Sequence, residues 1–139
     1  MNYWLLKTEP STYSWNDLNE QKNGIWDGVR NAEARNNMKR MNKGDVLLIY
    51  HTGDEKAVVG IAVVTREAFP EPDDQSPWVA IGLKPMLPLA RPVTLKEIKS
   101  DDRLANMSLV RMSRLSVQPV TTEEFSRLLE ISQTVWKPR

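Results

Sequence analysis

The chain reads VLLIYH at residues 46–51 and VVGIAVV at residues 58–64, two runs of strand length that are rich in β-branched side chains. Such runs favour the pleated, buried surface of a sheet. Between them, residues 52–54 (TGD) contain glycine and aspartate, which are typical of turns. These residues predict an antiparallel pair of strands at the centre of the fold.

Three further stretches are interpreted as strands. Residues 3–6 (YWLL) form an apolar, aromatic run, and residues 78–83 (WVAIGL) form a second. Residues 114–117 (RLSV) alternate between polar and apolar side chains, as one exposed and one buried face require. The sequence therefore predicts five strands.

Four short helices are predicted between the strands. Three of them begin at capping boxes, in which a serine or threonine is followed three residues later by an acid. The pairs are Ser14 with Asp17, Thr94 with Glu97 and Thr121 with Glu124. The first of these helices should stop near residues 23–24, and the last should run to about Ile131. The fourth helix covers residues 29–41, where Ala34, Met38 and Met41 recur at helical spacing.

Two segments are expected to be irregular. Residues 25–28 (IWDG) follow a helix end, and residues 69–74 (FPEPDD) carry two prolines and three acids, so we predict a loop there. Strands and helices alternate without the strict repeat that a parallel sheet needs. The fold class is therefore α+β, a small and mostly antiparallel β-barrel with short flanking helices.

Composition fits one soluble domain over residues 1–139. Nineteen basic and eighteen acidic residues give a net charge of +1, which excludes a polybasic, histone-like protein. Between residues 30 and 43, however, five basic residues stand against Glu33 alone. Any contact with nucleic acid must therefore be local, and this stretch is the candidate.

Several classes of site are excluded by residue type. The chain has no cysteine and one histidine, so it has neither a thiolate metal site nor a histidine-based metal cluster. No phosphate-binding glycine loop or dinucleotide fingerprint is present. The apolar run in residues 1–7 is too short for a signal peptide or a membrane span, so we expect a cytoplasmic protein or its nucleoid or nuclear equivalent. No metal and no cofactor are predicted.

Two stretches carry residues that are common in catalytic sites. The lone histidine, His51, ends a strand and is more often structural than catalytic in such a position. Lys7, Thr8 and Glu9 are consecutive, but in an extended strand Thr8 points away from the other two. Ion pairing at a strand end is therefore favoured over catalysis, and no catalytic residue is predicted.

Residues 26–31 (WDGVRN) combine an aromatic ring, a carboxylate, a glycine, a guanidinium and an amide. A tryptophan can stack on an extruded base, while Asp27 and Asn31 can contact its polar edge. The alternative is that Trp26 fills the core and Asp27 caps the next helix. Both interpretations remain open on the residues alone.

The motifs of this chain, in order, resemble those of the EVE domain family. They are YWLLKTEP (3–10), WDGVRN (26–31), ARNNM (34–38), KGD (43–45), YH (50–51), VGIA (59–62), RPVTL (91–95) and RLSV (114–117). The resemblance covers about residues 2–131 and leaves residues 132–139 as a short tail. It implies a PUA-like fold, a curled barrel with helices at its ends.

The resemblance also implies a binding function without turnover. EVE domains are similar in architecture to YTH readers, which enclose a methylated base in an aromatic cage, and the family is associated with modified cytosine in DNA or related modified bases. By motif, the implied base pocket comprises Lys7, Thr8, Glu9, Trp26, Asp27, Gly28, Val29, Arg30, Asn31, His51 and Thr52. The implied phosphate contacts are Arg30, Arg35, Asn36, Asn37 and Lys39. A second ring for the cage, from Tyr13 or Trp78, cannot be placed from the sequence.

Three functions remain open at this point. A reader of a modified base in DNA, flipped from its stack, is favoured, and we expect it to be a monomer. A PUA-like RNA-binding protein is the second. A small amidohydrolase of the ASCH type is the third, which would require Lys7 to approach Thr8 or Thr52 with Glu9 nearby.

Overall fold

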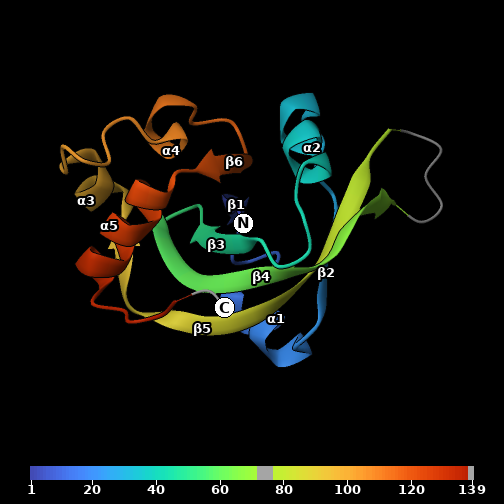
Figure 1. Ribbon diagram of the computed structural model, residues 1–139, viewed down its shortest axis with the longest axis horizontal. Coiled ribbons are helices and arrows are strands. Elements are labelled where there is room, and N and C mark those ends of the chain that lie inside the picture. The colour runs from blue at the N-terminus through green and yellow to red at the C-terminus, as the bar shows by residue number, and fades with distance from the viewer. Residues whose placement is uncertain (72–76, 138–139) are drawn as a thin grey trace.

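The computed structural model describes residues 1–71 and 77–137 of the chain. In this part of the chain, six strands form one curved sheet and five helices surround it (Figure 1). The strands are β1 (Tyr3–Thr8), β2 (Gly24–Trp26), β3 (Val46–His51), β4 (Ala57–Pro70), β5 (Val79–Thr94) and β6 (Val117–Val120). The helices are α1 (Trp15–Gln21), α2 (Ala32–Lys39), α3 (Leu95–Lys99), α4 (Ser108–Arg111) and α5 (Thr122–Ser132).

The sheet has the order β2-β5-β4-β3-β1-β6. Strands β1 and β3 are parallel, with Thr8 opposite His51, and the other four strand pairs are antiparallel. The predicted α+β class with a mostly antiparallel, curved sheet is thereby confirmed. The order is open and does not close into a full ring of strands, and α2 packs against β5 and β6, which lie toward the two ends of the order.

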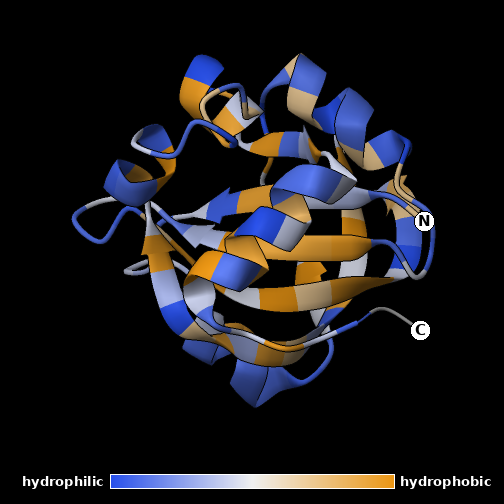
Figure 2. Cartoon of the chain, turned by 60° about the vertical axis from the view of Figure 1, so that its left-hand side comes forward, coloured by the Kyte–Doolittle hydropathy of each residue, from blue (hydrophilic) through white to orange (hydrophobic). Residues whose placement is uncertain are grey.

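Alternating side chains of the central strands supply two cores, one on each face of the sheet. Trp4 and Leu6 point to the core beneath α1 and α2, whereas Leu5 points to the core beneath α3, α4 and α5. Figure 2 shows the central strands mostly orange, with polar colour on the outer sides of the helices. Each helix therefore buries an apolar side against the sheet.

The capping boxes predicted from sequence all form. In each, the side-chain oxygen of the N-cap residue accepts from the backbone N–H three residues on, and the acid accepts from the N-cap backbone. The fourth predicted helix is shorter than expected, because Asn31 caps α2 at its start and Lys39 is its last residue. A further one-turn helix, α4, was not predicted.

The described residues form six strands rather than the predicted five, and several strand boundaries differ: β1 extends to Thr8, and β5 extends to Thr94 although the predicted strand ended at residue 83. Residues 24–26 form β2 because Trp26 pairs with Ile81 of β5, a contact that local sequence does not show. Phe69 and Pro70 belong to β4, and the rest of the predicted acidic loop, apart from Glu71, lies outside the described residues. Pro70 is tolerated because β3 pairs with β4 only as far as Val63 and leaves that edge open beyond it. The last strand begins at residue 117 rather than 114.

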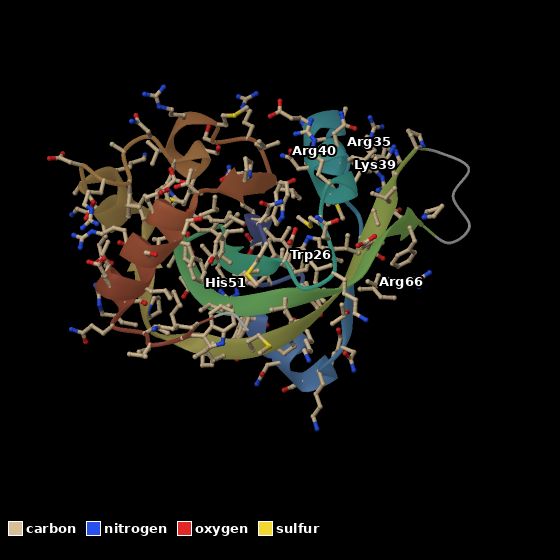
Figure 3. All side chains as sticks on the ribbon, in the orientation of Figure 1. Trp26, Arg35, Lys39, Arg40, His51 and Arg66 are labelled. Carbon is tan, nitrogen blue, oxygen red and sulfur yellow. The ribbon has the colours of Figure 1, made fainter. Side chains whose placement is uncertain are left out.

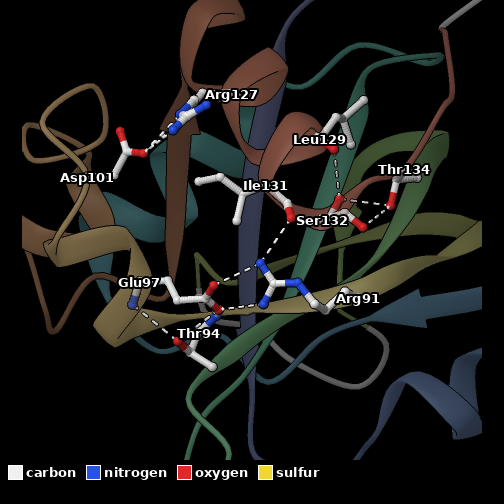
Figure 4. Close-up of polar contacts among 9 residues, drawn as sticks. All are labelled: Arg91, Thr94, Glu97, Asp101, Arg127, Leu129, Ile131, Ser132 and Thr134. Atoms are coloured by element: carbon white, nitrogen blue, oxygen red, sulfur yellow. Dashed lines mark hydrogen bonds and ion pairs between the residues drawn. The ribbon is translucent and has the colours of Figure 1, made fainter.

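The predicted tail is in part anchored to the fold (Figure 4). Arg91 donates a hydrogen bond to the Ile131 carbonyl at 3.0 Å, and Ala90 N–H donates to Thr134 Oγ1 at 2.9 Å. Ser132 is fully buried. Residues 132–134 therefore close the end of α5 against β5 instead of extending freely. Among the described residues, no helix is long and apolar enough to cross a membrane.

Candidate functional site

A cavity of about 830 Å³ opens beside the carboxyl end of β1. The residues around it come from β1, the segment between β1 and α1, the end of α1, β2, the segment that leads to α2, and the residue before β6. They are Lys7, Thr8, Glu9, Thr12, Tyr13, Gln21, Asn23, Ile25, Trp26, Asp27, Gly28, Val29, Arg30 and Ser116. Eight of these residues were named from the family motifs, and segments far apart in sequence bring them together.

Two aromatic rings form one corner of the cavity. The rings of Tyr13 and Trp26 lie edge to face, with centroids 5.8 Å apart and planes at 82°. Trp26 is only 7% exposed and belongs to the core, whereas Tyr13 is half-buried, so Tyr13 presents the more accessible ring. The Tyr13 hydroxyl donates to Gln21 Oε1 at 2.6 Å, and burial, together with the charges of Asp17 and Asp27, raises its pKa.

The end of β1 supplies the polar floor. Lys7 Nζ donates to the Ser113 carbonyl at 2.7 Å, and partial burial lowers the pKa of this amine. Thr8 Oγ1 donates to the Tyr13 carbonyl at 2.6 Å, which ties the aromatic corner to the strand. Glu9 is exposed, and hydrogen bonds from the backbone and side chain of Ser11 lower its pKa.

The buried carboxylate of Glu71, which the sequence did not indicate as a site residue, holds the part of the cavity wall formed by Gly28 and Arg30. Glu71 is 9% exposed and accepts a hydrogen bond from Gly28 N–H at 3.0 Å. Arg30 donates to both carboxylate oxygens of Glu71, at 2.9 and 2.7 Å. Gly28 has φ +79°, a backbone conformation that favours glycine. The turn from Trp26 to Arg30 is therefore fixed by a partner about forty positions later in the chain.

Trp78, the other candidate for a second ring, takes a different position. The guanidinium groups of Arg30 and Arg35 each lie 5.4 Å from the centroid of its ring. Such contacts are cation–π interactions. Trp78 therefore braces the basic side chains at the start of α2, and Tyr13 is the ring that accompanies Trp26 in the cavity.

Three residues of the predicted pocket do not line the cavity. Asn31 caps α2 by accepting from Ala34 N–H at 2.9 Å. His51 Nε2 accepts from the backbone N–H of Trp15 at 3.0 Å, and its Nδ1 lies 2.7 Å from Glu55 Oε1. These two contacts require the neutral tautomer with the proton on Nδ1.

Thr52, the third of these residues, sits next to the cavity wall rather than in it. Its Oγ1 lies 3.4 Å from Glu9 Oε2 and donates to the Thr8 carbonyl at 3.3 Å. Lys7 Nζ, in contrast, is hydrogen-bonded to Ser113. The contacts of the described residues therefore do not assemble the lysine, threonine and glutamate that the amidohydrolase alternative needs.

The predicted phosphate-binding residues divide into two groups. Arg35 and Lys39 lie on α2 and Arg40 is its C-cap, and Figure 3 shows all three basic side chains around this helix. Asn36 is exposed and accepts from Arg35 at 3.3 and 3.2 Å. Asn37 is buried instead.

Asn37 is a correction to the predicted phosphate contacts, and Arg30 has an acidic partner within the chain. Asn37 Nδ2 donates to the Val117 carbonyl at 2.8 Å, which ties α2 to β6 and leaves no path to a phosphate. The charge of Arg30 is offset by the carboxylate of Glu71. The helix therefore presents its positive charge through Arg35, Lys39 and Arg40.

The curved sheet, with helices on both faces and a cavity at the end of its parallel strand pair, defines a PUA-like module. The chain belongs to the EVE domain family, whose model matches residues 2–131. Within the described residues, no group of three or more histidine, aspartate or glutamate side chains is placed to hold a metal ion. The match of the family model confirms the resemblance of the motifs.

Similar proteins come from bacteria and animals. Thymocyte nuclear protein 1 of Mus musculus is 30% identical, over 96% of this chain and 74% of that protein. The solved structure of Rpa0253 from Rhodopseudomonas palustris is 41% identical, covers 99% of this chain and 97% of that one, and has a TM-score of 0.92. A crystal structure of human THYN1 protein in complex with DNA containing 5-methylcytosine is 28% identical, covers 98% of this chain and 100% of that one, and has a TM-score of 0.88.

Proposed function

We propose that this protein binds DNA by receiving one modified cytosine base in the cavity at the end of β1. The observation that carries the proposal is the Tyr13–Trp26 corner with the carboxylate of Asp27 beside it, in a fold similar to one solved with methylated DNA. An aromatic ring that stacks on a nucleic-acid base contributes about 1 to 3 kcal/mol. The base leaves the duplex to enter, at a cost of a few kcal/mol, which stacking and polar contacts offset.

Within the cavity, we assign the stacking surface to Tyr13 and the rigid backing to Trp26. Tyr13 is held from two sides, by its hydroxyl on Gln21 and by its carbonyl on Thr8. Trp26 is almost fully buried and cannot move aside. A base entering from solvent therefore meets the tyrosine ring first.

Asp27 gives the site its preference for cytosine over thymine. A methylated cytosine and thymine share the methyl group, but cytosine carries an amino group where thymine carries a carbonyl. Asp27 is exposed at the cavity wall, and its charge acts on the Tyr13 hydroxyl, so it lies near the aromatic corner. A carboxylate accepts a hydrogen bond from the amine and repels the carbonyl.

The backbone contacts are assigned to α2. Arg35 and Lys39 lie on α2 and Arg40 is its C-cap, and the first turn of this helix follows the cavity wall directly. They bind phosphates next to the extruded base. Each phosphate contact to duplex DNA adds about 0.9 to the negative slope of log affinity against log salt concentration.

The test is a fluorescence-anisotropy titration of matched DNA duplexes that carry cytosine, 5-methylcytosine, 5-hydroxymethylcytosine or thymine at one position, at low and moderate salt. RNA versions of the same probes are titrated in parallel. We expect one modified cytosine to bind about tenfold more tightly than cytosine, since an apolar contact with one methyl group discriminates by roughly 1 to 3 kcal/mol. Asp27→Asn should reduce the preference over thymine but leave the salt slope unchanged. Equal affinity for all DNA probes, or a preference for RNA, would contradict the proposal.

A further inference from the structure

A second, smaller cavity lies directly beside the first. It measures about 340 Å³ and is lined by Asn31, Glu33, Arg111, Met112, Ser113, Arg114 and Leu115. Arg30 of the first cavity precedes Asn31 of the second, and Leu115 of the second precedes Ser116 of the first. The two cavities are therefore lined by consecutive residues of the same two chain segments, and residues 111–114 lie close to the proposed base pocket, where Lys7 contacts Ser113.

The backbone of this segment is held from beneath by two side chains. Lys7 Nζ donates to the Ser113 carbonyl at 2.7 Å. Gln118 is fully buried, and its Nε2 donates to the carbonyls of Met112 and Leu115 at 3.1 and 2.8 Å. The segment is therefore set in one conformation before any partner arrives, which reduces the entropy lost on binding.

Its side chains, in contrast, face solvent. Met112 is 41% exposed, one of few large apolar side chains so exposed in the described part of the chain. Arg111 and Arg114 flank it and are both exposed. Arg111 donates to Asn106 Oδ1 at 2.6 Å, while Arg114 has no hydrogen bond or ion pair with any described residue. Glu33, on the α2 side of the small cavity, is the one acid among its lining residues.

An apolar side chain between two cations matches what duplex DNA presents once a base has left its stack. The withdrawn base leaves a gap between its neighbours, and methionine is among the apolar side chains that proteins insert between base steps. The phosphates on either side of the gap are negative and accept hydrogen bonds from arginine. A rigid segment beside the base pocket is in the right place to contact both.

We propose that residues 111–114 are a second DNA-contacting element, in which Met112 enters the gap that the extruded base leaves and Arg114, with Arg111, binds the flanking phosphates. This inference rests on the proposed function, because the gap exists only if the base enters the cavity. It assigns the duplex to a position across the pocket entrance, between α2 and the segment that joins α4 to β6. In Figure 1 these two elements lie on the same side of the molecule.

The experiment compares Met112→Ala with Met86→Ala, because Met86 is 42% exposed but lines neither cavity. Both variants are titrated by fluorescence anisotropy against a duplex with one 5-methylcytosine and against the same modified strand alone. We expect Met112→Ala to bind the duplex about tenfold more weakly and the single strand within twofold of the unchanged protein, since only a duplex has a gap to fill. Met86→Ala should match the unchanged protein on both probes.

Arg114→Gln tests the phosphate contact, with the exposed Arg103→Gln as its control. We expect Arg114→Gln to lower the magnitude of the salt slope by about 0.9, equally for methylated and unmethylated duplexes. If the unchanged protein prefers methylated duplex but Met112→Ala and Arg114→Gln behave as their controls do, the inference is overturned and the proposed function stands. If the unchanged protein shows no preference, both are overturned.

Discussion

Replacing Glu71 by alanine should loosen the wall of the cavity and destabilise the fold. The change removes the acceptor of the Gly28 N–H bond and the partner of both Arg30 contacts. A hydrogen bond to a charged group contributes about 1.5 to 3 kcal/mol. The Arg30 side chain is 49% exposed, so solvent screening limits its pair to about 1 kcal/mol. We expect the free energy of unfolding to fall by about 2 to 4 kcal/mol on these grounds.

The assay is thermal unfolding followed by circular dichroism, with Glu20→Ala as the control, since Glu20 is exposed on α1. For a domain of this size, 1 kcal/mol corresponds to about 4 °C, so the Glu71→Ala midpoint should fall by about 10 °C. Glu71→Gln keeps an acceptor for the glycine and should lose less. The affinity for methylated DNA, measured where the variant is still folded, should fall with Glu71→Ala and not with Glu20→Ala. A midpoint within 2 °C of the control, by the same scale of about 4 °C per kcal/mol, would refute the role assigned to this carboxylate.

Three further changes test the fold and its electrostatics. Asp45 is 2% exposed and accepts from Asn2 N–H through one carboxylate oxygen and from Trp4 Nε1 through the other. In Asp45→Asn the amide NH2 must face one of these N–H donors, so the change should cost about 3 kcal/mol in urea unfolding, and a loss below about 1 kcal/mol would contradict this. Trp26→Ala should cost about 3 to 5 kcal/mol in the same assay, because the side chain is in the core, and an unchanged midpoint would show that the ring is not a packing element. A hydrogen bond from Arg127 lowers the pKa of Asp101 below its ordinary value of 3.8. The ionised pair therefore adds to the free energy of unfolding above pH 3.8, and this contribution is lost as the pH falls through the lowered pKa. In Arg127→Gln, an NMR titration should find the Asp101 pKa moved up toward 3.8, and an unmoved pKa would exclude the pair as its cause.

The parts of the fold that local sequence encodes were predictable. The apolar run at residues 46–51 forms β3 with the predicted bounds, because Val46, Ile49 and Tyr50 favour strands and the run is of strand length. The capping boxes at Ser14, Thr94 and Thr121 each satisfy backbone N–H groups within three residues. These interactions join residues that are close together in the sequence, so the elements that they form can be predicted without knowledge of the tertiary structure.

Other parts depend on partners far away in the chain. Residues 24–26 become a strand only because β5 offers an edge, and β5 itself contains prolines that a local pattern excludes. Glu71 follows a proline in what looked like an acidic loop, and nothing near it indicates that Gly28 needs an acceptor. The aromatic corner has the same origin, since Tyr13 meets Trp26 across two elements.

His51 shows how a residue of a family motif can serve the cavity without lining it. Its Nε2 accepts from the backbone of Trp15, the first residue of α1, and β3 places it opposite Thr8, whose hydroxyl holds the Tyr13 carbonyl. The ends of these two neighbouring strands thus each hold residues 13–15 by a hydrogen bond to the backbone. The parallel pairing of β1 with β3 therefore helps to position the Tyr13 backbone, and His51 contributes to the cavity through its contact with the backbone of Trp15. Residues 7–9 line the cavity and His51 lies behind it, and the contacts of Thr8 with Tyr13 and of His51 with Trp15 connect the two through the backbone of residues 13–15.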